Sequence, residues 1–387
     1  MCVTPVFSQD DYDYMARAIA LAKKGLYSTK PNPAVGCVIV NQGEVVGEGW
    51  HQRAGMPHAE RVALANAGAK AKGATVYVTL EPCSHHGRTP PCADGLIEAG
   101  VVEVVMAMVD PNPLVSGQGI ARLKQAGIEV KTGLMEEEAR NLNKGFIHKM
   151  QSQMPYVKIK MATSLDGRTA MENGESQWIT GAEARADVHK MRAQTGAIVT
   201  GIGTVLADNP SLTVRLSDDE LKVMNLTPEN AHPLRVILDP NLSMPLDAKM
   251  LSQFGRTLVM TTKESVERSP ELVEAMFAKQ IEVVAVSARE DRLDVKAILK
   301  YLAEEENIND VLVESGSMVA GGFIASGYVN EIHSFIAPCL MGNKAKPMFD
   351  LPSMRFMNDK IEFQFESMMR FGEDIKLVLK PKKNVVE

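Results

Sequence analysis

The strongest constraint on this chain is a His-Ala-Glu triplet at 58–60 that is followed by two cysteines, Cys83 and Cys92. One imidazole and two thiolates form a zinc ligand set that leaves the fourth tetrahedral position open for water. Zinc lowers the pKa of such a water toward neutrality. We therefore predict that His58, Cys83 and Cys92 bind zinc. Glu60, a carboxylate outside the ligand set, is the predicted catalytic group that moves protons.

The fold must bring these residues to one point, and this restricts the local structure. Residues two apart on a helix point roughly 200° apart, so His58 and Glu60 reach the same metal only where the chain enters a helix. Pro57 directly before His58 is typical of a helix start, and the Pro-Pro pair at 90–91 has the same place before Cys92. Thiolates at helix N-termini are stabilised by the helix dipole. We therefore expect one helix to begin at His58 and another at Cys92.

A structural zinc site is the alternative to a catalytic one. Structural sites are closed by a fourth ligand, and His85 or His86, which lie between the cysteines, could supply it. Glu60 has no purpose in such a site, and this favours the catalytic interpretation. The order of residues is that of zinc deaminases, which usually have two residues between the cysteines. Here eight residues, 84–91, separate them.

Length, charge and cysteine content exclude several classes of protein. A chain of 387 residues predicts two or more domains, because single cores seldom grow beyond about 250–300 residues. The net charge of −6 argues against nucleic-acid binding and against a basic membrane surface. Five unevenly spread cysteines argue against a disulfide framework and favour a cytoplasmic location. We see no secretory signal and no apolar run long enough for a membrane-spanning helix.

Strands alternate with helices along the chain, which indicates layered α/β domains. The polar stretch 137–155 marks the expected boundary, so we expect one domain over 1–150 and a second over 155–387. The predicted helices cover 10–26, 58–71, 92–99, 181–193 and 293–306. The predicted strands cover 35–40, 43–50, 74–80, 101–108, 156–162, 197–201, 234–239, 257–261, 282–286 and 311–315.

The second half carries a weaker signal, the stretch VLVESGSMVAGGF at 311–323. It predicts a strand, a glycine-rich loop and a helix. Glycines let the backbone approach a ligand, and the N-terminus of a following helix favours phosphate. The stretch is not the GxGxxG fingerprint of dinucleotide-binding folds. A plain strand–turn–helix without a ligand therefore stays open on the residues alone.

Motifs from both halves together resemble one family, the bifunctional riboflavin-biosynthesis deaminase–reductases. The resemblance extends from about residue 12 to about residue 380 and includes the expanded loop between the cysteines. The motifs that carry it are PNPAVGCVIV (31–40), HAE (58–60), VTLEPCSHHGRTPPC (78–92), DPNP (110–113), KMATSLDGRTA (160–170), GESQWITG (174–181), HKMRAQTGAIVTGIGTVLADNPSLTVR (189–215) and VESGSMVAGG (313–322).

The resemblance implies a fold, two activities and their cofactors. It implies a cytidine-deaminase-like α/β/α domain followed by a dihydrofolate-reductase-like α/β domain. It implies zinc-dependent hydrolytic deamination of 2,5-diamino-6-ribosylamino-4(3H)-pyrimidinone 5′-phosphate. NADPH would then reduce the ribosyl side chain of the product to ribityl. The expected partners are small pyrimidine ribosyl phosphates and further copies of the chain in a dimer or tetramer, with no nucleic acid and no membrane.

The resemblance also implies site residues in the second half and one in the first. Two arginines could hold a phosphate, and serine, aspartate and glutamate can hold sugar hydroxyls. The residues expected at NADPH are Ala162, Trp178, Thr204, Gly316, Ser317, Met318, Val319, Ala320, Gly321 and Gly322. The residues expected at the substrates are Asn32, Ser176, Arg192, Asp208, Leu212, Arg215 and Glu314. No residue emerges as the proton donor of the reductive step.

Some of these residues have simpler interpretations. Asn32 lies between two prolines and could be only a turn residue, and Arg192 could be on a solvated helix face. Trp178 could belong to the core, and Asp166 in its Ser-Leu-Asp-Gly turn could be structural. Rival functions are a nucleic-acid deaminase with an appended domain and a zinc-stabilised nucleotide-binding module. A bifunctional chain with one inactive half is a third alternative.

Overall fold

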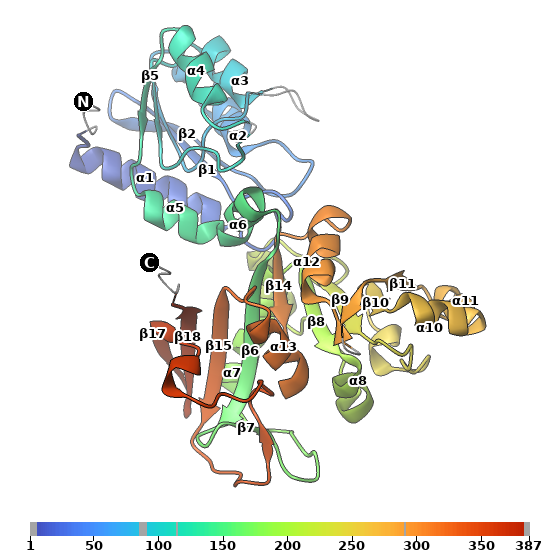
Figure 1. Ribbon diagram of the computed structural model, residues 1–387. Coiled ribbons are helices and arrows are strands. Elements are labelled where there is room, and N and C mark those ends of the chain that lie inside the picture. The colour runs from blue at the N-terminus through green and yellow to red at the C-terminus, as the bar shows by residue number, and fades with distance from the viewer. Residues whose placement is uncertain (1–5, 85–90, 114, 290–291, 383–387) are drawn as a thin grey trace. The chain divides into compact units, whose positions relative to one another are not determined.

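The computed structural model describes residues 6–84, 91–113, 115–289 and 292–382, which divide into two compact units (Figure 1). The first unit comprises the chain up to residue 153 together with 219–226, and the second comprises 154–218 and the chain from 227 onward. No helix among the described residues has both the length and the apolar character needed to cross a lipid bilayer.

The first unit is a three-layer α/β/α sandwich. Within its described residues the sheet has the strand order β2-β1-β3-β4-β5, with β1 antiparallel to β2 and β3, and β3, β4 and β5 parallel. Its strands are β1 (Gly36–Asn41), β2 (Glu44–Trp50), β3 (Thr75–Val78), β4 (Glu103–Met106) and β5 (Glu129–Thr132). Its helices are α1 (Gln9–Lys23), α2 (Ala59–Ala67), α3 (Cys92–Ala99), α4 (Gln118–Gln125), α5 (Glu136–Leu142) and α6 (Lys144–Ser152).

Apolar side chains on both faces of this sheet determine where the helices pack. Alternate residues of β1 point to opposite faces: Cys37 and Ile39 pack against α2, α3 and α4, whereas Val38 and Val40 pack against α1, α5 and α6. The polar stretch that marks the predicted boundary is thus helical, because residues such as Ala139 bury one face of α5 on the sheet.

The second unit contains a larger mixed sheet. In the described part of this unit the order is β11-β10-β9-β8-β14-β6-β15-β18-β17, parallel from β11 to β15 and antiparallel at β18 and β17. Its strands are β6 (Tyr156–Ser164), β8 (Ala197–Gly201), β9 (Leu234–Leu238), β10 (Thr257–Thr261), β11 (Ile281–Ala285), β14 (Asp310–Val313), β15 (Glu331–Ala337), β17 (Phe363–Phe371) and β18 (Asp374–Pro381). Smaller strands are β7 (Arg168–Ala170), β12 (Ala288–Arg289), β13 (Arg292–Leu293) and β16 (Lys346–Pro347).

Helices cover both faces of this sheet, as parallel strands buried on both sides require. Helices α12 and α13 pack on the face formed by residues such as Val157 and Val236, and α8 and α11 pack on the face formed by residues such as Ile198 and Ile237. The helices are α7 (Ala182–Gln194), α8 (Ile202–Asp208), α9 (Asp218–Val223), α10 (Lys263–Arg268), α11 (Pro270–Ala278), α12 (Val295–Glu304) and α13 (Ser317–Ala325). The predicted α/β class is confirmed for both units.

Candidate active sites

The first candidate site is formed by His58, Cys83 and Cys92. The Nδ1 atom of His58 lies 3.6 Å from Sγ of Cys83 and 3.4 Å from Sγ of Cys92, and the three ligand atoms lie within 4.8 Å of one another. A tetrahedral zinc ion with bonds of about 2.0–2.1 Å to nitrogen and about 2.3 Å to sulfur would separate these atoms by roughly 3.6 Å. The side chains therefore have the spacing that a zinc ion needs.

Helix starts bring these ligands together. His58 caps the N-terminus of α2, and Cys92 is the first residue of α3, directly after Pro91. The backbone N–H of Cys92 donates to Sγ of Cys83 at 3.3 Å. Hydrogen bonds from the Cys92 thiol and from His58 lower the pKa of the Cys83 thiol, which favours the thiolate form that binds metal ions. His85 and His86, the alternative fourth ligands, lie outside the described residues.

Glu60 lies beside the ligands, on the first turn of α2. Its side chain is buried, and burial together with the nearby Cys83 raises the pKa of this carboxyl group to about 7. A carboxyl group with a pKa close to the working pH can both accept and return a proton.

Asn32 is held at this site by a histidine that the sequence reasoning missed. Nε2 of His51 lies 3.1 Å from Nδ2 of Asn32, and Nδ1 of His51 lies 3.2 Å from the carbonyl oxygen of Pro57. Because a carbonyl only accepts, Nδ1 carries the proton and Nε2 accepts from the Asn32 amide. The His51 ring meets the His58 ring edge to face at 5.3 Å. No spacing motif signals His51; only the fold places it beside the ligands.

The second candidate site is a cavity of about 640 Å³ in the second unit, next to β6, β8 and β14. Ligands of parallel sheets bind outside the carboxyl ends of the strands, and β8 and β14 end here. Most of the residues expected at NADPH and at the substrate line this cavity, namely Ala162, Ser176, Trp178, Arg192, Thr204, Asp208, Leu212, Arg215, Glu314, Gly316, Ser317, Met318, Val319 and Gly322. Ala320 and Gly321 do not line it, and Asn32 lies in the first unit.

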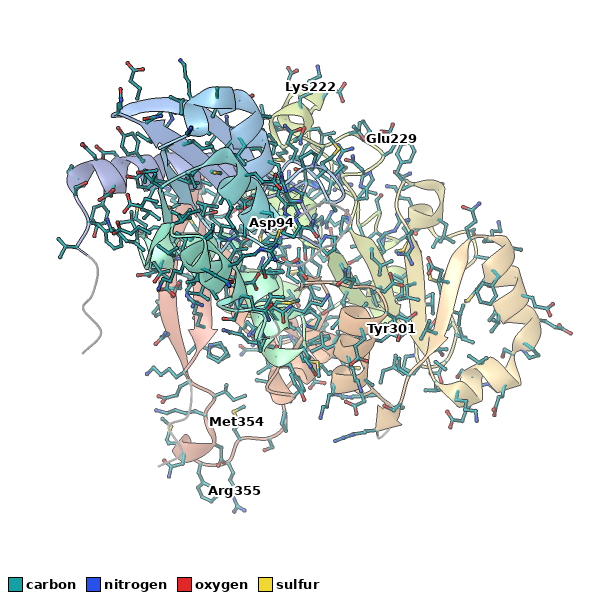
Figure 2. The ribbon with its side chains drawn as sticks, turned by 90° about the horizontal axis from the view of Figure 1, so that it is seen from above. Asp94, Lys222, Glu229, Tyr301, Met354 and Arg355 are labelled. Carbon is teal, nitrogen blue, oxygen red and sulfur yellow. The ribbon has the colours of Figure 1, made fainter. Side chains whose placement is uncertain are left out.

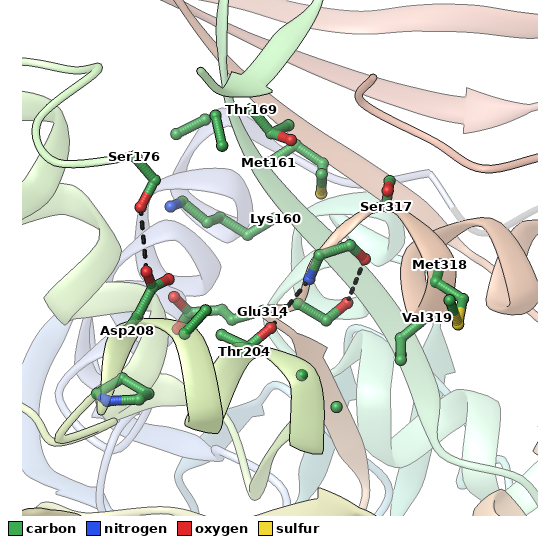
Figure 3. Close-up of a pocket in the computed structure, with 18 of the residues that line it drawn as sticks. Lys160, Met161, Thr169, Ser176, Thr204, Asp208, Glu314, Ser317, Met318 and Val319 are labelled. Carbon is green, nitrogen blue, oxygen red and sulfur yellow. Dashed lines mark hydrogen bonds between the residues drawn. The ribbon is translucent and has the colours of Figure 1, made fainter. Parts of the chain in front are cut away.

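The prediction of a glycine-rich loop after β14 is wrong, because residues 317–322 form the first turns of α13. Gly316 caps the helix, and its N–H donates to Oγ1 of Thr204 at 3.2 Å (Figure 3). Gly321 lies inside the helix, where a Cβ atom would lie 1.9 Å from the carbonyl oxygen of Asp350. Gly321 thus permits close packing of two backbones, and Ala320 is buried in the core.

Arg192 and Glu314 form a bidentate pair at the cavity wall, with Nε–Oε1 and Nη2–Oε2 distances of 2.6 and 2.9 Å. Arg192 is therefore not on a solvated helix face. Lys160 on β6 is a cavity residue that the sequence reasoning missed; it points into the cavity on the side of Ser176 and Asp208 (Figure 3). Burial lowers the pKa of the Lys160 ammonium. The only sequence signal was a lysine in the middle of an apolar strand.

The remaining cavity residues include a neutral histidine and an exposed tryptophan. His189 accepts a hydrogen bond from the backbone N–H of Arg215 at 3.2 Å, and burial, with the charges of Arg192 and Arg215, lowers the pKa of His189 to about 4. Trp178 is 66% exposed and stacks on the Arg185 guanidinium at 4.6 Å, so it is not a core residue.

Asp166 accepts hydrogen bonds from Ser164 and from backbone N–H groups at 341–342, which indicates a structural role.

Two family models match the chain. The RibD C-terminal domain matches residues 155–377, and the cytidine and deoxycytidylate deaminase zinc-binding region matches residues 8–108. Riboflavin biosynthesis protein RibD of Escherichia coli strain K12 is 47% identical over 96% of this chain and 99% of its own length. The RibD protein of Aquifex aeolicus is 42% identical over 96% of this chain and 98% of its own length.

Solved structures agree with these matches. RibD of Acinetobacter baumannii, form 1, superposes with a TM-score of 0.88 at 44% identity, covering 97% of this chain and 99% of that one. A Thermotoga maritima protein is described as a diaminohydroxyphosphoribosylaminopyrimidine deaminase/5-amino-6-(5-phosphoribosylamino)uracil reductase. It superposes with a TM-score of 0.82 at 36% identity, covering 96% of this chain and 99% of that one.

Proposed function

The chain belongs to the RibD family of bifunctional riboflavin-biosynthesis enzymes, and from this membership we propose which of its residues carry each reaction. The enzyme is a zinc-dependent deaminase of 2,5-diamino-6-ribosylamino-4(3H)-pyrimidinone 5′-phosphate. It is also an NADPH-dependent reductase of 5-amino-6-(5-phosphoribosylamino)uracil. We assign the deaminase to 1–150 and the reductase to 155–387. The observation that carries the assignment is the convergence of His58, Cys83 and Cys92 beside buried Glu60.

In the deaminase, His58, Cys83 and Cys92 are the proposed zinc ligands. Zinc held by three protein ligands supplies an acidified water at its fourth position. Glu60 would take up one proton from the attacking water and deliver it to the ring nitrogen of the pyrimidine. It would then take up the second proton of that water and pass it to the amino group, which leaves as ammonia. The side-chain amide of Asn32 donates a hydrogen bond to His51. The Oδ1 atom of Asn32 is then proposed to accept a hydrogen bond from the pyrimidine.

In the reductase, NADPH supplies the hydride and the protein supplies orientation and a proton. The proposed nicotinamide dinucleotide site comprises the start of α13, Thr204, Ala162 and Trp178. Two observations support it. The helix N-terminus favours phosphate. Apart from the helix's own backbone and the residues next in the chain, no atom of the described residues lies within 4 Å of the Cβ position of Gly322, so this wall of the cavity is open.

Lys160 is the proposed proton donor of the reductive step. Because burial lowers the pKa of its ammonium, Lys160 gives up a proton more readily than an exposed lysine does. Ser176 and Asp208, joined by a hydrogen bond of 3.3 Å, are proposed to bind the sugar hydroxyls together with Glu314. Arg215 is proposed to bind the phosphate.

We further propose that the chain forms a homo-oligomer through the edge strand β17. An edge strand presents unpaired backbone groups to a second chain, and β17 exposes Phe365 and Met368. Met354 and Arg355, on the segment that precedes β17, also project into solvent (Figure 2). Light scattering should report a dimer or tetramer for the native chain, and Phe365→Glu should shift it toward monomer. A native chain that is monomeric at micromolar concentration would contradict this proposal.

A cytoplasmic location is proposed from the free thiols of Cys37, Cys83, Cys92 and Cys339.

A paired assay tests the assignment of the two reactions. The purified, zinc-loaded protein is given the diamino-pyrimidinone ribosyl phosphate with and without NADPH, and ammonia release and NADPH loss are followed. Ammonia release under both conditions, with NADPH consumed after it, is the expected result. Ammonia release without NADPH loss would remove the reductase assignment, and no ammonia release from zinc-loaded protein would remove the deaminase assignment.

A further inference from the structure

Arg61 links the two helices that carry the zinc ligands. It lies on α2, three residues after His58, and its Nη2 atom donates a hydrogen bond of 2.7 Å to the carbonyl oxygen of Pro91. Pro91 caps α3, and Cys92 follows as the first residue of that helix. One side chain on the His58 helix thus contacts the backbone just before Cys92.

Gly95 provides the space that this contact requires. A Cβ atom at Gly95 would lie 2.5 Å from Nη1 and 2.7 Å from Cζ of Arg61. Gly95 is a buried residue inside α3, where glycine weakens a helix and alanine strengthens it. The backbone conformation does not demand glycine here, since Gly95 is not among the residues with positive φ. The close approach of the Arg61 guanidinium explains why position 95 is a glycine.

We infer that Arg61 is a positioning residue for the zinc ligand Cys92. Outer-shell groups that orient metal ligands typically change metal affinity by about 10–100-fold when they are removed. Arg61 holds the start of α3 against α2, so it fixes the position of Cys92 relative to His58. Gly95 completes the contact by leaving room for the guanidinium. This inference rests on the proposed zinc site and adds a residue that does not touch the metal.

The experiment measures the equilibrium affinity of the full-length protein for Zn²⁺ by competition with a chromophoric chelator. The variants are Arg61→Met, Gly95→Ala and the double variant, with Arg17→Met as a control that also removes one positive charge. Arg17 lies on α1, which packs on the opposite face of the sheet from α2 and α3, and it pairs with Glu48. We expect each single variant to bind Zn²⁺ roughly tenfold more weakly, and Arg17→Met to bind it as the native protein does.

The double variant distinguishes positioning from a general loss of stability. Gly95→Ala strengthens the intrinsic preference of α3 for helix, so weaker zinc binding in this variant cannot come from a weaker helix. Because both substitutions remove the same contact, their effects should not add, and the double variant should bind Zn²⁺ no more weakly than Arg61→Met.

Native affinity in both single variants would overturn the role of Arg61, as would fully additive losses in the double variant. Circular dichroism establishes that each variant is folded; if Arg61→Met is not, Gly95→Ala alone decides, because it displaces the guanidinium and leaves the arginine in place. A native protein that binds no Zn²⁺ would remove the proposed zinc site itself. Equal zinc affinity of all variants would remove only the inference about Arg61.

Discussion

Arg192 and Glu314 face each other as a bidentate ion pair at the wall of the cavity, with side chains only 12% and 8% exposed. Although burial opposes it, the charge of Arg192 and its hydrogen bonds hold the pKa of Glu314 below its ordinary value. Removing one partner of a buried pair leaves an unpaired charge and costs about 3–5 kcal/mol. We therefore predict that Arg192→Met lowers the free energy of unfolding of the second unit by about this amount and abolishes NADPH oxidation. Urea denaturation and the paired assay measure these two effects.

The control for this prediction is the double variant Arg192→Met/Glu314→Met. It removes both charges, so it should be more stable than Arg192→Met alone. Ammonia release, which depends on the first unit, should persist in both variants. Unchanged stability in Arg192→Met would contradict the view that this pair is a buried, mutually dependent unit.

The lowered pKa of His189 predicts that the folded protein loses stability in mild acid. Burial and the charges of Arg192 and Arg215 lower the pKa of His189 to about 4 in the folded protein, against an ordinary value of about 6.5. The unfolded chain therefore takes up the proton first, and stability falls as the pH drops from about 6.5 to about 4. We expect a contribution on the order of 2 kcal/mol between pH 7 and pH 5.

The measurement for His189 is urea denaturation at several pH values, for the native protein and for His189→Gln. Glutamine keeps a polar group at this position but does not titrate. The dependence of stability on pH should therefore be shallower in His189→Gln. Parallel curves for the two proteins would show that His189 does not carry this effect, because other buried histidines titrate equally in both.

Glu60→Gln should separate the two reactions. Glutamine has the size of glutamate but cannot accept a proton, and general acid–base groups contribute about 10²–10⁴ to rates. Ammonia release should fall by this factor, whereas zinc content should stay native because Glu60 is not a proposed ligand. NADPH oxidation with previously deaminated substrate should be unaffected. Substantial deamination by the variant would refute the role of Glu60.

Lys160→Met should lower activity without lowering stability. Methionine fills a similar volume and removes an ammonium whose burial disfavours its charge. The rate of NADPH oxidation should therefore fall by about 10²–10⁴, as expected for a lost proton donor, while the midpoint of thermal unfolding stays unchanged or rises. A variant that is less stable than the native protein would assign Lys160 a structural role instead.

The convergence of the candidate zinc ligands could be predicted from sequence, because zinc chemistry imposes a spacing on its ligands. A histidine, a glutamate two residues later and two cysteines after prolines determine both the ligands and the helix starts. His51 and Lys160 could not be predicted in this way. Each is a single polar residue without a fixed spacing to its partners, and each reaches its site only because the fold brings distant segments together.

Elements without a clear pattern of apolar and polar residues were also not predicted from the sequence. Strand β17 exposes most of its side chains, so it lacks the alternation that identifies a half-buried strand. Helices α5 and α6 bury few residues in a polar stretch. The glycines of α13 suggest a loop by composition, but Gly321 is needed for a close backbone contact inside a helix. Such contacts depend on segments distant in sequence, and no local pattern encodes them.

Two neighbouring glycines in α13 should respond to alanine in opposite ways. A Cβ atom at Gly321 would lie 1.9 Å from the carbonyl oxygen of Asp350, and a backbone atom cannot move aside without shifting the chain. Gly321→Ala should therefore lower the free energy of unfolding by about 1–3 kcal/mol or more. At Gly322 no other described part of the chain comes within 4 Å of the Cβ position, the surrounding helix backbone aside, so alanine should gain up to about 1 kcal/mol of helix preference.

The added methyl group of Gly322→Ala would enter the cavity, since Gly322 lines it. We therefore expect Gly322→Ala to keep or raise the midpoint of thermal unfolding and to weaken NADPH binding, measured by titration of cofactor fluorescence. Gly321→Ala should lower the thermal midpoint whether or not NADPH is present. If Gly322→Ala binds NADPH as tightly as the native protein, the cofactor does not pass along this side of α13, and the proposed dinucleotide site must be moved.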